Sequence, residues 1–497
     1  MRIPHRSQLL LNVTPISQIE LNLECRDRMI PTLVALQFIY TNPDFRDKAL
    51  QLVERDLAQH ADLNKGKPGM TLWQILVLAA VKQACDYTYD HLQYLAENDR
   101  NMEAMLQRRS WQEEELFKWK RIQANVCLVR PETIEEISHL VVAEGHRLAP
   151  EAAEQVRGDC FVTDTNIHYP TESSLIVDGL TKIVDIGPKL AALTGQSRWR
   201  QSKSLLKKAK RAARAIGRIK KGAKYQERLQ AAYGELFHYT DLLLPRAADL
   251  LDSALGNLSS GTGDSSSDGL LSAGEAMALY QELVYWQAVT EHVRGTAWRR
   301  VMEGEQVPNP EKLFSLFEPD TELIKRGKAS QPVQFGHRVL VIEDAAGFIC
   351  HHKIVPLHVE EREIVVGEMA ALQKRLQDRI QRASFDRGFH SPENQTGLAR
   401  IVKHPCLPKT GSHQSAEQRS NSTVEFRESQ RRHSGVESAI GALQSGNGLE
   451  RCRDHSRLGY ERYVALGVLG RNLLVLGKLL ICQRSPTSAA AYSKRAA

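Results

Sequence analysis

Three carboxylates from distant parts of the chain could hold metal ions together: Asp164, Asp386 and Glu437. Asp164 follows a short apolar run and precedes a polar stretch, and Asp386 directly follows a phenylalanine. Each aspartate is therefore expected at the exposed end of a buried strand, which would hold its oxygens still for a metal or a substrate. Glu437 lies in a predicted C-terminal helix. We predict that the three side chains converge into one acidic pocket.

Each of these acids also has a simpler explanation. An aspartate at a strand end is more often a turn former or a helix cap. Ser434 and Glu437 have the spacing of a capping box, in which the glutamate would only close the start of a helix. Lone histidines are more often structural than metal ligands, so the predicted metal set leaves out His168, His390 and His433.

Arginines gather around Glu437, and their density favours a phosphate group passing nearby. The predicted phosphate contacts are Arg431 and Arg432. The arginines of this region are Arg427, Arg431, Arg432, Arg451, Arg453 and Arg457.

The most uneven charge lies between Lys203 and Lys224, where ten residues are Lys or Arg and none is acidic. A helix of like charges repels itself unless another group neutralises it, and DNA phosphates do so with release of counterions. A solvated surface helix is the usual explanation of such a run, but ten positive charges without an acid favour nucleic acid. The residues predicted to bind DNA here are Lys203, Lys207, Lys208, Lys210, Arg211, Arg214 and Arg218.

The alternation of helical and β patterns predicts an α/β protein with two helical additions. Apolar residues at helical spacing run from 9 to 148, whereas apolar runs around a Gly-containing turn predict a β-hairpin over 338–355. A Gly- and Ser-rich stretch at 253–274 is typical of a flexible loop between two helices. The predicted parts are a helical N-terminal DNA-binding or dimerisation domain (1–155), an α/β domain with a mixed sheet flanked by helices (156–194 and 326–482), a basic helical insertion (195–325) and a flexible tail (483–497).

Length and composition narrow the class of protein. A chain of 497 residues is too long for one core, so two or three domains are expected. The eight cysteines form no CxxC pair, which argues against a zinc ribbon or a disulfide scaffold and favours a cytoplasmic location. The N-terminus lacks the apolar core of a secretion signal. The longest apolar stretch, 463–481, contains Arg471 and Lys478, so it is predicted to be a core helix rather than a membrane span.

Four blocks of sequence together resemble a known family. They are TDTNIHYPTESSLIVDG, EPDTELIKRGKASQPVQFGHRVLV, FDRGFHSPEN, and RRHSGVESAIGALQ with GLERCRDHSRLGYERYVALGVLGRNL. Over roughly residues 70 to 480 the chain is similar to bacterial insertion-sequence transposases of the DDE type, close to the ISNCY group. The resemblance implies an RNase H-like catalytic domain. It also implies that Asp164, Asp386 and Glu437 are the metal-binding carboxylates and that the helical region before residue 150 binds DNA.

The function implied by the resemblance is DNA cleavage and strand transfer at the ends of an insertion sequence. Two Mg²⁺ ions would serve as cofactors, with Mn²⁺ as a substitute, because hard cations prefer carboxylate oxygens. The implied partners are double-stranded DNA, both element ends and target, and a second copy of the chain in the active complex. The implied location is the nucleoid of a bacterial cytoplasm.

The chain departs from some relatives around the glutamate. Those relatives carry Tyr, Arg and Lys at the positions that are Gln430, His433 and Gln444 here. Two other functions share the basic surface: an RNase H-like nuclease or resolvase that cuts without joining, and a catalytically inactive DNA-binding protein. An intact carboxylate trio separates the two enzymes from the inactive protein.

Overall fold

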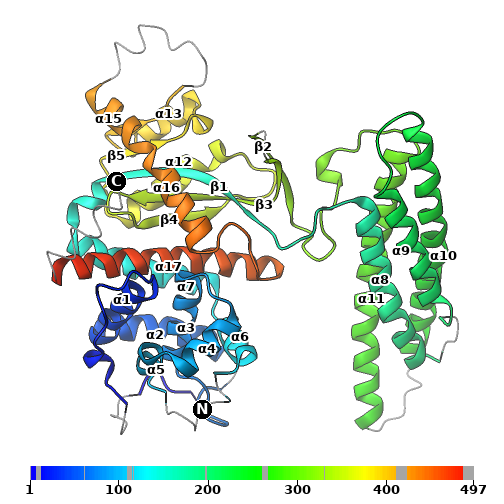
Figure 1. Cartoon of the computed structure of the whole chain (residues 1–497), viewed down its shortest axis with the longest axis horizontal. Coiled ribbons are helices and arrows are strands. Elements are labelled where there is room, and N and C mark those ends of the chain that lie inside the picture. Colours follow the sequence, from blue (N-terminus) through cyan, green and yellow to red (C-terminus); the bar gives the residue numbers. More distant parts are fainter. Residues whose placement is uncertain are drawn as a thin grey trace. The chain divides into compact units, whose positions relative to one another are not determined.

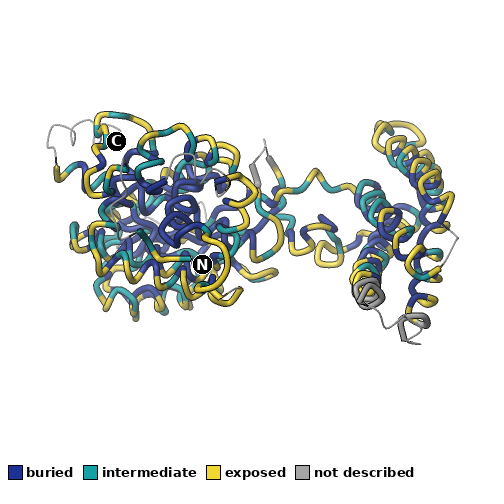
Figure 2. Tube along the Cα trace, turned by 90° about the horizontal axis from the view of Figure 1, so that it is seen from below, coloured by how far each residue is buried: buried dark blue, intermediate teal, exposed yellow. Residues whose placement is uncertain are grey.

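The computed structural model forms two compact units (Figure 1). The sheet unit contains residues 1–166 and 336–497, and the helical unit contains residues 167–335. Each unit has its own buried interior (Figure 2). The structure describes residues 2–6, 13–60, 62–108, 115, 117–195, 199–259, 267–328, 331–409 and 423–484, without the side chains of 256–259, 267–273, 326–328 and 331.

The first part of the sheet unit is helical, as the apolar spacing predicts. Thr71 caps α3 in a capping box with Gln74, because its side chain accepts a hydrogen bond from the Gln74 amide. Pro131 occupies the first turn of α7, as expected from its missing N–H. The helices are α1 (Met29–Thr41), α2 (Pro43–Ala58), α3 (Leu72–Ala84), α4 (Tyr89–Asn98), α5 (Arg100–Met105), α6 (Trp119–Val126) and α7 (Pro131–Leu148).

The C-terminal apolar stretch forms one long helix, α17 (Ser456–Arg484). It packs against α1, α3 and α7 (Figure 1). The approach is close, since a Cβ added at Gly477 would lie 1.8 Å from the carbonyl oxygen of Pro31. The helix is long and apolar enough to cross a membrane, but 83% of its most apolar window is buried inside the protein, as predicted for a core helix.

One hydrophobic core runs from the N-terminal helices through α17 into the sheet. The predicted boundary at residue 155 therefore does not separate two compact units. The reason is α17, whose apolar surface is too wide to be covered by the sheet alone.

The sheet is mixed and flanked by helices, as predicted. β1 pairs antiparallel with β3 and parallel with β5, while β3 also pairs antiparallel with β4, and β5 pairs parallel with β6. A sixth strand, β2, pairs with β3. The strands are β1 (Gln155–Asp164), β2 (Glu322–Lys328), β3 (Gln331–Asp344), β4 (Ile349–Ile354), β5 (Arg382–Phe385) and β6 (His404–Cys406).

The two faces of the sheet join different hydrophobic cores, and α17 contributes to both. Val156 and Ala383 join the large core, which includes α12 (Glu361–Arg375). Phe161 joins a smaller core with residues of α17 and of the π-helical turn Ala442–Gly446, which follows α16 (Gly435–Gly441). Alternation along a strand makes this division possible. The remaining helices of the unit are α13 (Pro392–Ala399) and α15 (Val424–His433).

The predicted hairpin is confirmed as β3 and β4. Its turn contains Gly347 at a φ of +92°, a conformation that favours glycine. The Asp344 carboxylate fastens the turn by accepting hydrogen bonds from the amides of Ala346 and Phe348 at 2.9 and 3.0 Å. The same carboxylate also bonds His146 and Cys350 in the hydrophobic core.

The helical unit packs four helices around its own core (Figure 1). They are α8 (Glu172–Leu193), α9 (Ser202–Ile216), α10 (Tyr225–Ser259) and α11 (Ser267–Val301). The predicted insertion began at residue 195, but α8 packs against α9, α10 and α11 and belongs to this unit. The predicted flexible loop at 253–274 is mostly helix; its centre, 260–266, and the predicted tail from 485 on lie outside the described residues.

Candidate active site

The parallel pairing of β1 and β5 brings two aspartates together. Arg157 lies opposite Ser384, and Gly158 lies opposite Phe385. The next position on each strand is Asp159 on β1 and Asp386 just after β5. Because the register continues one residue at a time, these two carboxylates share one level of the sheet.

Glu437 reaches the same place from α16, which packs on β1. The pKa of Asp159 is raised to about 6, first by burial and then by the negative charges of Asp386, Glu361 and Glu437, against a hydrogen bond from the Cys160 amide at 2.7 Å. Asp386 and Glu437 are exposed, so the site is open to solvent. Asp159, Asp386 and Glu437 are hereafter the acidic cluster.

His433 lies beside this cluster. Burial lowers its pKa, and the negative charges of Asp386 and Glu437 oppose that shift. Its Nδ1 is 3.2 Å from the Ser384 hydroxyl on β5. A neutral imidazole in this position orients the site without adding positive charge to it. By contrast, His168 lies in the helical unit, 3.5 Å from an Asp178 oxygen.

Asp164 lies at the far end of β1. Its strand partner is Gly336, its amide donates to the Glu450 carbonyl at 3.0 Å, and its carbonyl accepts from the Cys452 amide at 2.8 Å. Five residues of strand separate it from Asp159, roughly 16 Å along the sheet, and an odd spacing turns its side chain to the opposite face. The strand register therefore places Asp159, and not Asp164, level with Asp386.

The sequence contained a signal for Asp159 that the prediction missed. β1 begins at Gln155, so the segment VRGDCFV is already strand. The rule that a functional acid follows the apolar run favoured Asp164. A polar residue in the middle of a buried strand is the rarer event, and it pointed to Asp159.

The simpler explanations for the other two acids do not hold. The Ser434 hydroxyl donates to the Arg431 carbonyl at 3.0 Å, and no side chain caps α16, so Glu437 closes no capping box. Asp386 occupies the cap position of the short turn Arg387–Phe389, yet its side chain makes no capping hydrogen bond.

Arg157 ties the end of α15, just before the helix that carries Glu437, to the sheet. Its guanidinium bonds the Glu343 carboxylate at 2.7 and 2.6 Å and donates to the Arg432 carbonyl at 2.9 Å. Burial raises the pKa of Glu343, and the positive charges of Arg157 and Arg471 oppose that shift. A Cβ added at Gly435 would lie 2.0 Å from the Arg157 Nη1, so glycine is what lets the start of α16 sit against this side chain.

A second polar cluster lies deep in the core of the sheet unit. His146 Nε2 is 2.7 Å from the Asp344 carboxylate, and the Cys350 sulfur is 3.5 Å from the same oxygen and 3.8 Å from the histidine. The three atoms could hold a metal ion by distance. All three side chains are buried, and the aspartate also fastens the hairpin turn, so the group is a satisfied hydrogen-bond network that joins α7 to β3 and β4.

The predicted DNA-binding residues lie mostly on one face of α9. Five apolar side chains of this helix, among them Leu205, Ala209 and Ile216, join the core of the helical unit. The helix ends at Ile216, so the basic run to Lys224 is not one helix. Lys210 is half-buried, and the exposed members of the predicted set are Lys203, Lys207, Lys208, Arg211, Arg214 and, beyond the helix end, Arg218.

The predicted phosphate contacts Arg431 and Arg432 are exposed at the end of α15. The Arg432 guanidinium donates to the Gln155 side chain at 2.7 Å. No protein-family model, no curated protein and no solved structure matches this chain.

Proposed function

We propose that the chain is a DDE-type insertion-sequence transposase that cuts DNA and joins the free end to a target. The observation that carries this proposal is the strand register that sets Asp159 beside Asp386, with Glu437 presented from the helix above. Three carboxylates from three distant segments have no structural reason to share one solvent-open site. Their mutual repulsion costs free energy unless a cation neutralises it.

The sheet supports an RNase H-like catalytic domain as the finer description of the fold. Three strands, β4, β3 and β1, form an antiparallel meander, and β5 and β6 follow in parallel with β1. This is the strand arrangement that we expect of that fold, with one carboxylate on the central strand and one at the end of its parallel neighbour.

The acidic cluster would hold two Mg²⁺ ions, or Mn²⁺ in their place, once the ions draw the carboxylates together, because the three side chains do not lie within 4.8 Å of one another in the described structure. All of its donors are hard carboxylate oxygens, and the pKa of Asp159 is raised first by burial and then by the negative charges of its neighbours, which a bound cation would offset. When bound, the ions would stabilise the charge on the attacking and leaving oxygens of an in-line displacement at phosphorus. The protein's part is to hold the carboxylates rigidly on β1, β5 and α16.

DNA would lie along the exposed lysines and arginines of α9, with the exposed Arg431 at the end of α15 as a further phosphate contact. Phosphate contacts of this kind position DNA without reading its sequence. A second copy of the chain in the active complex and a place on the bacterial nucleoid complete the proposal.

The test compares carboxylate variants on DNA taken from the inverted repeats that flank the reading frame. Asp159→Asn, Asp386→Asn and Glu437→Gln should each bind these ends and fail to cut them in Mg²⁺. Asp164→Asn is the matched control, since it removes a carboxylate from the same strand on the other face, and it should cut like wild type. Cleavage without transfer of the cut end would support a nuclease instead, and cleavage by the Asp159 variant at the wild-type rate would refute the proposed site.

A further inference from the structure

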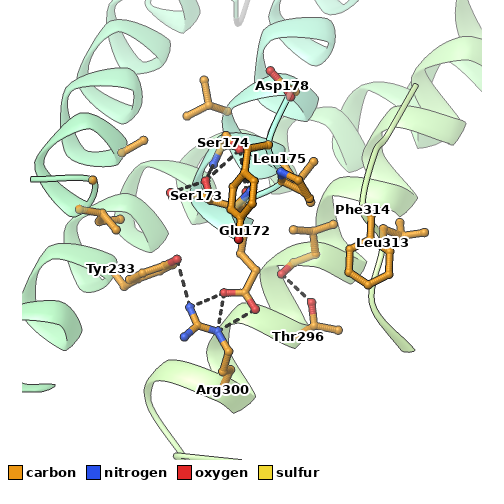
Figure 3. A pocket seen from close by; sticks show the side chains of 18 of the residues that line it. Glu172, Ser173, Ser174, Leu175, Asp178, Tyr233, Thr296, Arg300, Leu313 and Phe314 are labelled. Carbon is orange, nitrogen blue, oxygen red and sulfur yellow. Dashed lines mark hydrogen bonds and ion pairs between the residues drawn. The ribbon is translucent and has the colours of Figure 1, made fainter. Parts of the chain in front are cut away.

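A pocket of about 820 Å³ opens at one end of the helical unit (Figure 3). It lies between the start of α8, the end of α9, the start of α10 and the end of α11. Its size falls within the range of small-molecule sites in proteins. The acidic cluster is not part of it, and the proposed mechanism makes no use of it.

The pocket is positively charged. Four basic side chains line it, against the two acids Glu172 and Asp178. Glu172 is fully engaged, because it accepts two hydrogen bonds from the Arg300 Nε at 2.8 and 2.6 Å, beside Tyr233 (Figure 3). The basic side chains are Lys210, Arg214, Arg300 and Lys312.

Lys210 and Arg214 belong both to the pocket and to the basic helix α9. Lys203, Lys207 and Arg211 of the same helix do not line the pocket. A phosphate held by Lys210 and Arg214 would therefore sit where the proposed DNA track meets the pocket mouth.

Aromatic rings form another part of the wall. Tyr169, Phe335 and Phe314 follow one another at centroid distances of 5.6 and 5.5 Å. Tyr169 is 71% exposed, although a large aromatic side chain is usually covered. Exposed rings beside cationic groups are the surface on which unstacked bases bind.

A buried acceptor adds a third property. Asp178 Oδ2 is buried and has no hydrogen-bond partner among the described residues, although the His168 Nε2 lies 3.5 Å from it. Burial raises the pKa of this carboxyl, and His168 and Lys210 oppose the shift. The side chain as a whole is 26% exposed and lines the pocket, so a donor such as the exocyclic amino group of a base could pair with its carboxylate.

We propose that this pocket binds one nucleotide, with its phosphate at Lys210 and Arg214, its base against the aromatic wall, and an amino group of the base near Asp178. Either an unstacked nucleotide of DNA or a free mononucleotide has this chemistry. The idea that the nucleotide belongs to DNA rests on the proposed function. The idea that the pocket binds a nucleotide does not.

The experiment measures binding of the full chain in EDTA, so that cleavage plays no part. The probes are a DNA duplex with one unpaired adenosine, the same duplex with an unpaired thymidine, the fully paired duplex, and AMP alone. Wild type should bind the unpaired adenosine about tenfold more tightly than the paired duplex. Thymidine, which lacks an exocyclic amino group, should show a smaller gain.

Matched variants separate the pocket from general DNA binding. Tyr169→Ala should lose the preference for the unpaired nucleotide, and Tyr94→Ala, which removes another exposed tyrosine, should keep it. Lys210→Ala should lose the preference, whereas Lys207→Ala should weaken all duplexes alike. Because binding is measured in EDTA, these results do not depend on whether the transposase proposal holds.

Two outcomes would decide where the bound nucleotide comes from and whether the pocket binds one at all. If AMP binds but the unpaired duplex is not preferred, the pocket binds a nucleotide, and that nucleotide is a free mononucleotide rather than part of DNA. Equal affinity for all duplexes together with no AMP binding would overturn the proposal.

Discussion

The acidic cluster takes its residues from β1, the end of β5 and α16, whereas the basic face of α9 takes all of its residues from one helix. The first exists only when the sheet has formed in the correct register. The second exists as soon as α9 is helical, because residues three and four apart share a face. A site for chemistry therefore depends on tertiary structure here, and a surface for binding depends on local structure.

Because the acidic cluster depends on tertiary structure and on each of its three carboxylates, we expect a single substitution in it to abolish most of its activity. Asp386→Asn should lower DNA cleavage by about 1,000-fold, the upper end of the cost of removing one electrostatic stabiliser in an active site. Binding in a gel-shift assay should stay within about twofold of wild type. Equal cleavage by this variant and wild type would place the chemistry elsewhere.

The basic face should tolerate single changes and respond to combined ones. The variant Lys203→Ala, Lys207→Ala, Arg211→Ala should weaken binding to every DNA sequence alike and lower the slope of log K against log salt by about 2 to 3, since each lost phosphate contact removes about 0.9. Lys189→Ala on α8 is the control and should leave the slope unchanged. A loss confined to one DNA sequence would show that these residues read bases.

The raised pKa of Asp159 predicts how metal binding depends on pH. With a pKa of about 6, Asp159 is mostly protonated at pH 5 and charged at pH 7. Mg²⁺ affinity, measured by calorimetry, should therefore rise about tenfold between pH 5 and 7 and level off above pH 7. Asp159→Asn should flatten this dependence, and a steep dependence in that variant would point to another group.

The same carboxyl should affect stability without metal. Its folded pKa lies above the ordinary value of 3.8, so the folded state holds the proton more tightly than the unfolded state. The free energy of unfolding should fall as pH rises from about 4 to about 6, by on the order of 1–2 kcal/mol. Denaturant titrations in EDTA should show that Asp159→Asn no longer loses stability as the pH rises from about 4 to about 6.

The smallest effects should come from substitutions of residues that hold α16 against the sheet. Arg157→Gln removes the link between Glu343 and the Arg432 carbonyl, and it should weaken Mg²⁺ binding about tenfold, as changes next to metal ligands typically do. Gly435→Ala should have a similar but weaker effect, because its Cβ would displace the Arg157 side chain. Gly441→Ala, with open space around the added Cβ, is the matched control.

The elements with strong local signals could be predicted from the sequence. The hairpin of β3 and β4, the capped start of α3, the proline at the start of α7, the core helix α17 and the amphipathic basic helix α9 each follow from apolar periodicity, turn residues, prolines and caps. The mixed sheet with flanking helices follows from their order along the chain. Asp386 was identified from such a local pattern, the end of a predicted strand, whereas Glu437 was identified from the resemblance to the transposase family.

Only the tertiary structure decided which acid joins them and where the units divide. Strand register is set by pairing between segments more than 200 residues apart, and five positions along β1 move a carboxylate from one site to another and to the opposite face. The assignment of α8 to the helical unit and the merging of the N-terminal helices with the sheet depend on which apolar faces meet. Sequence alone determined the composition of those faces, and packing determined their partners, because burial is favourable against any apolar surface of suitable shape.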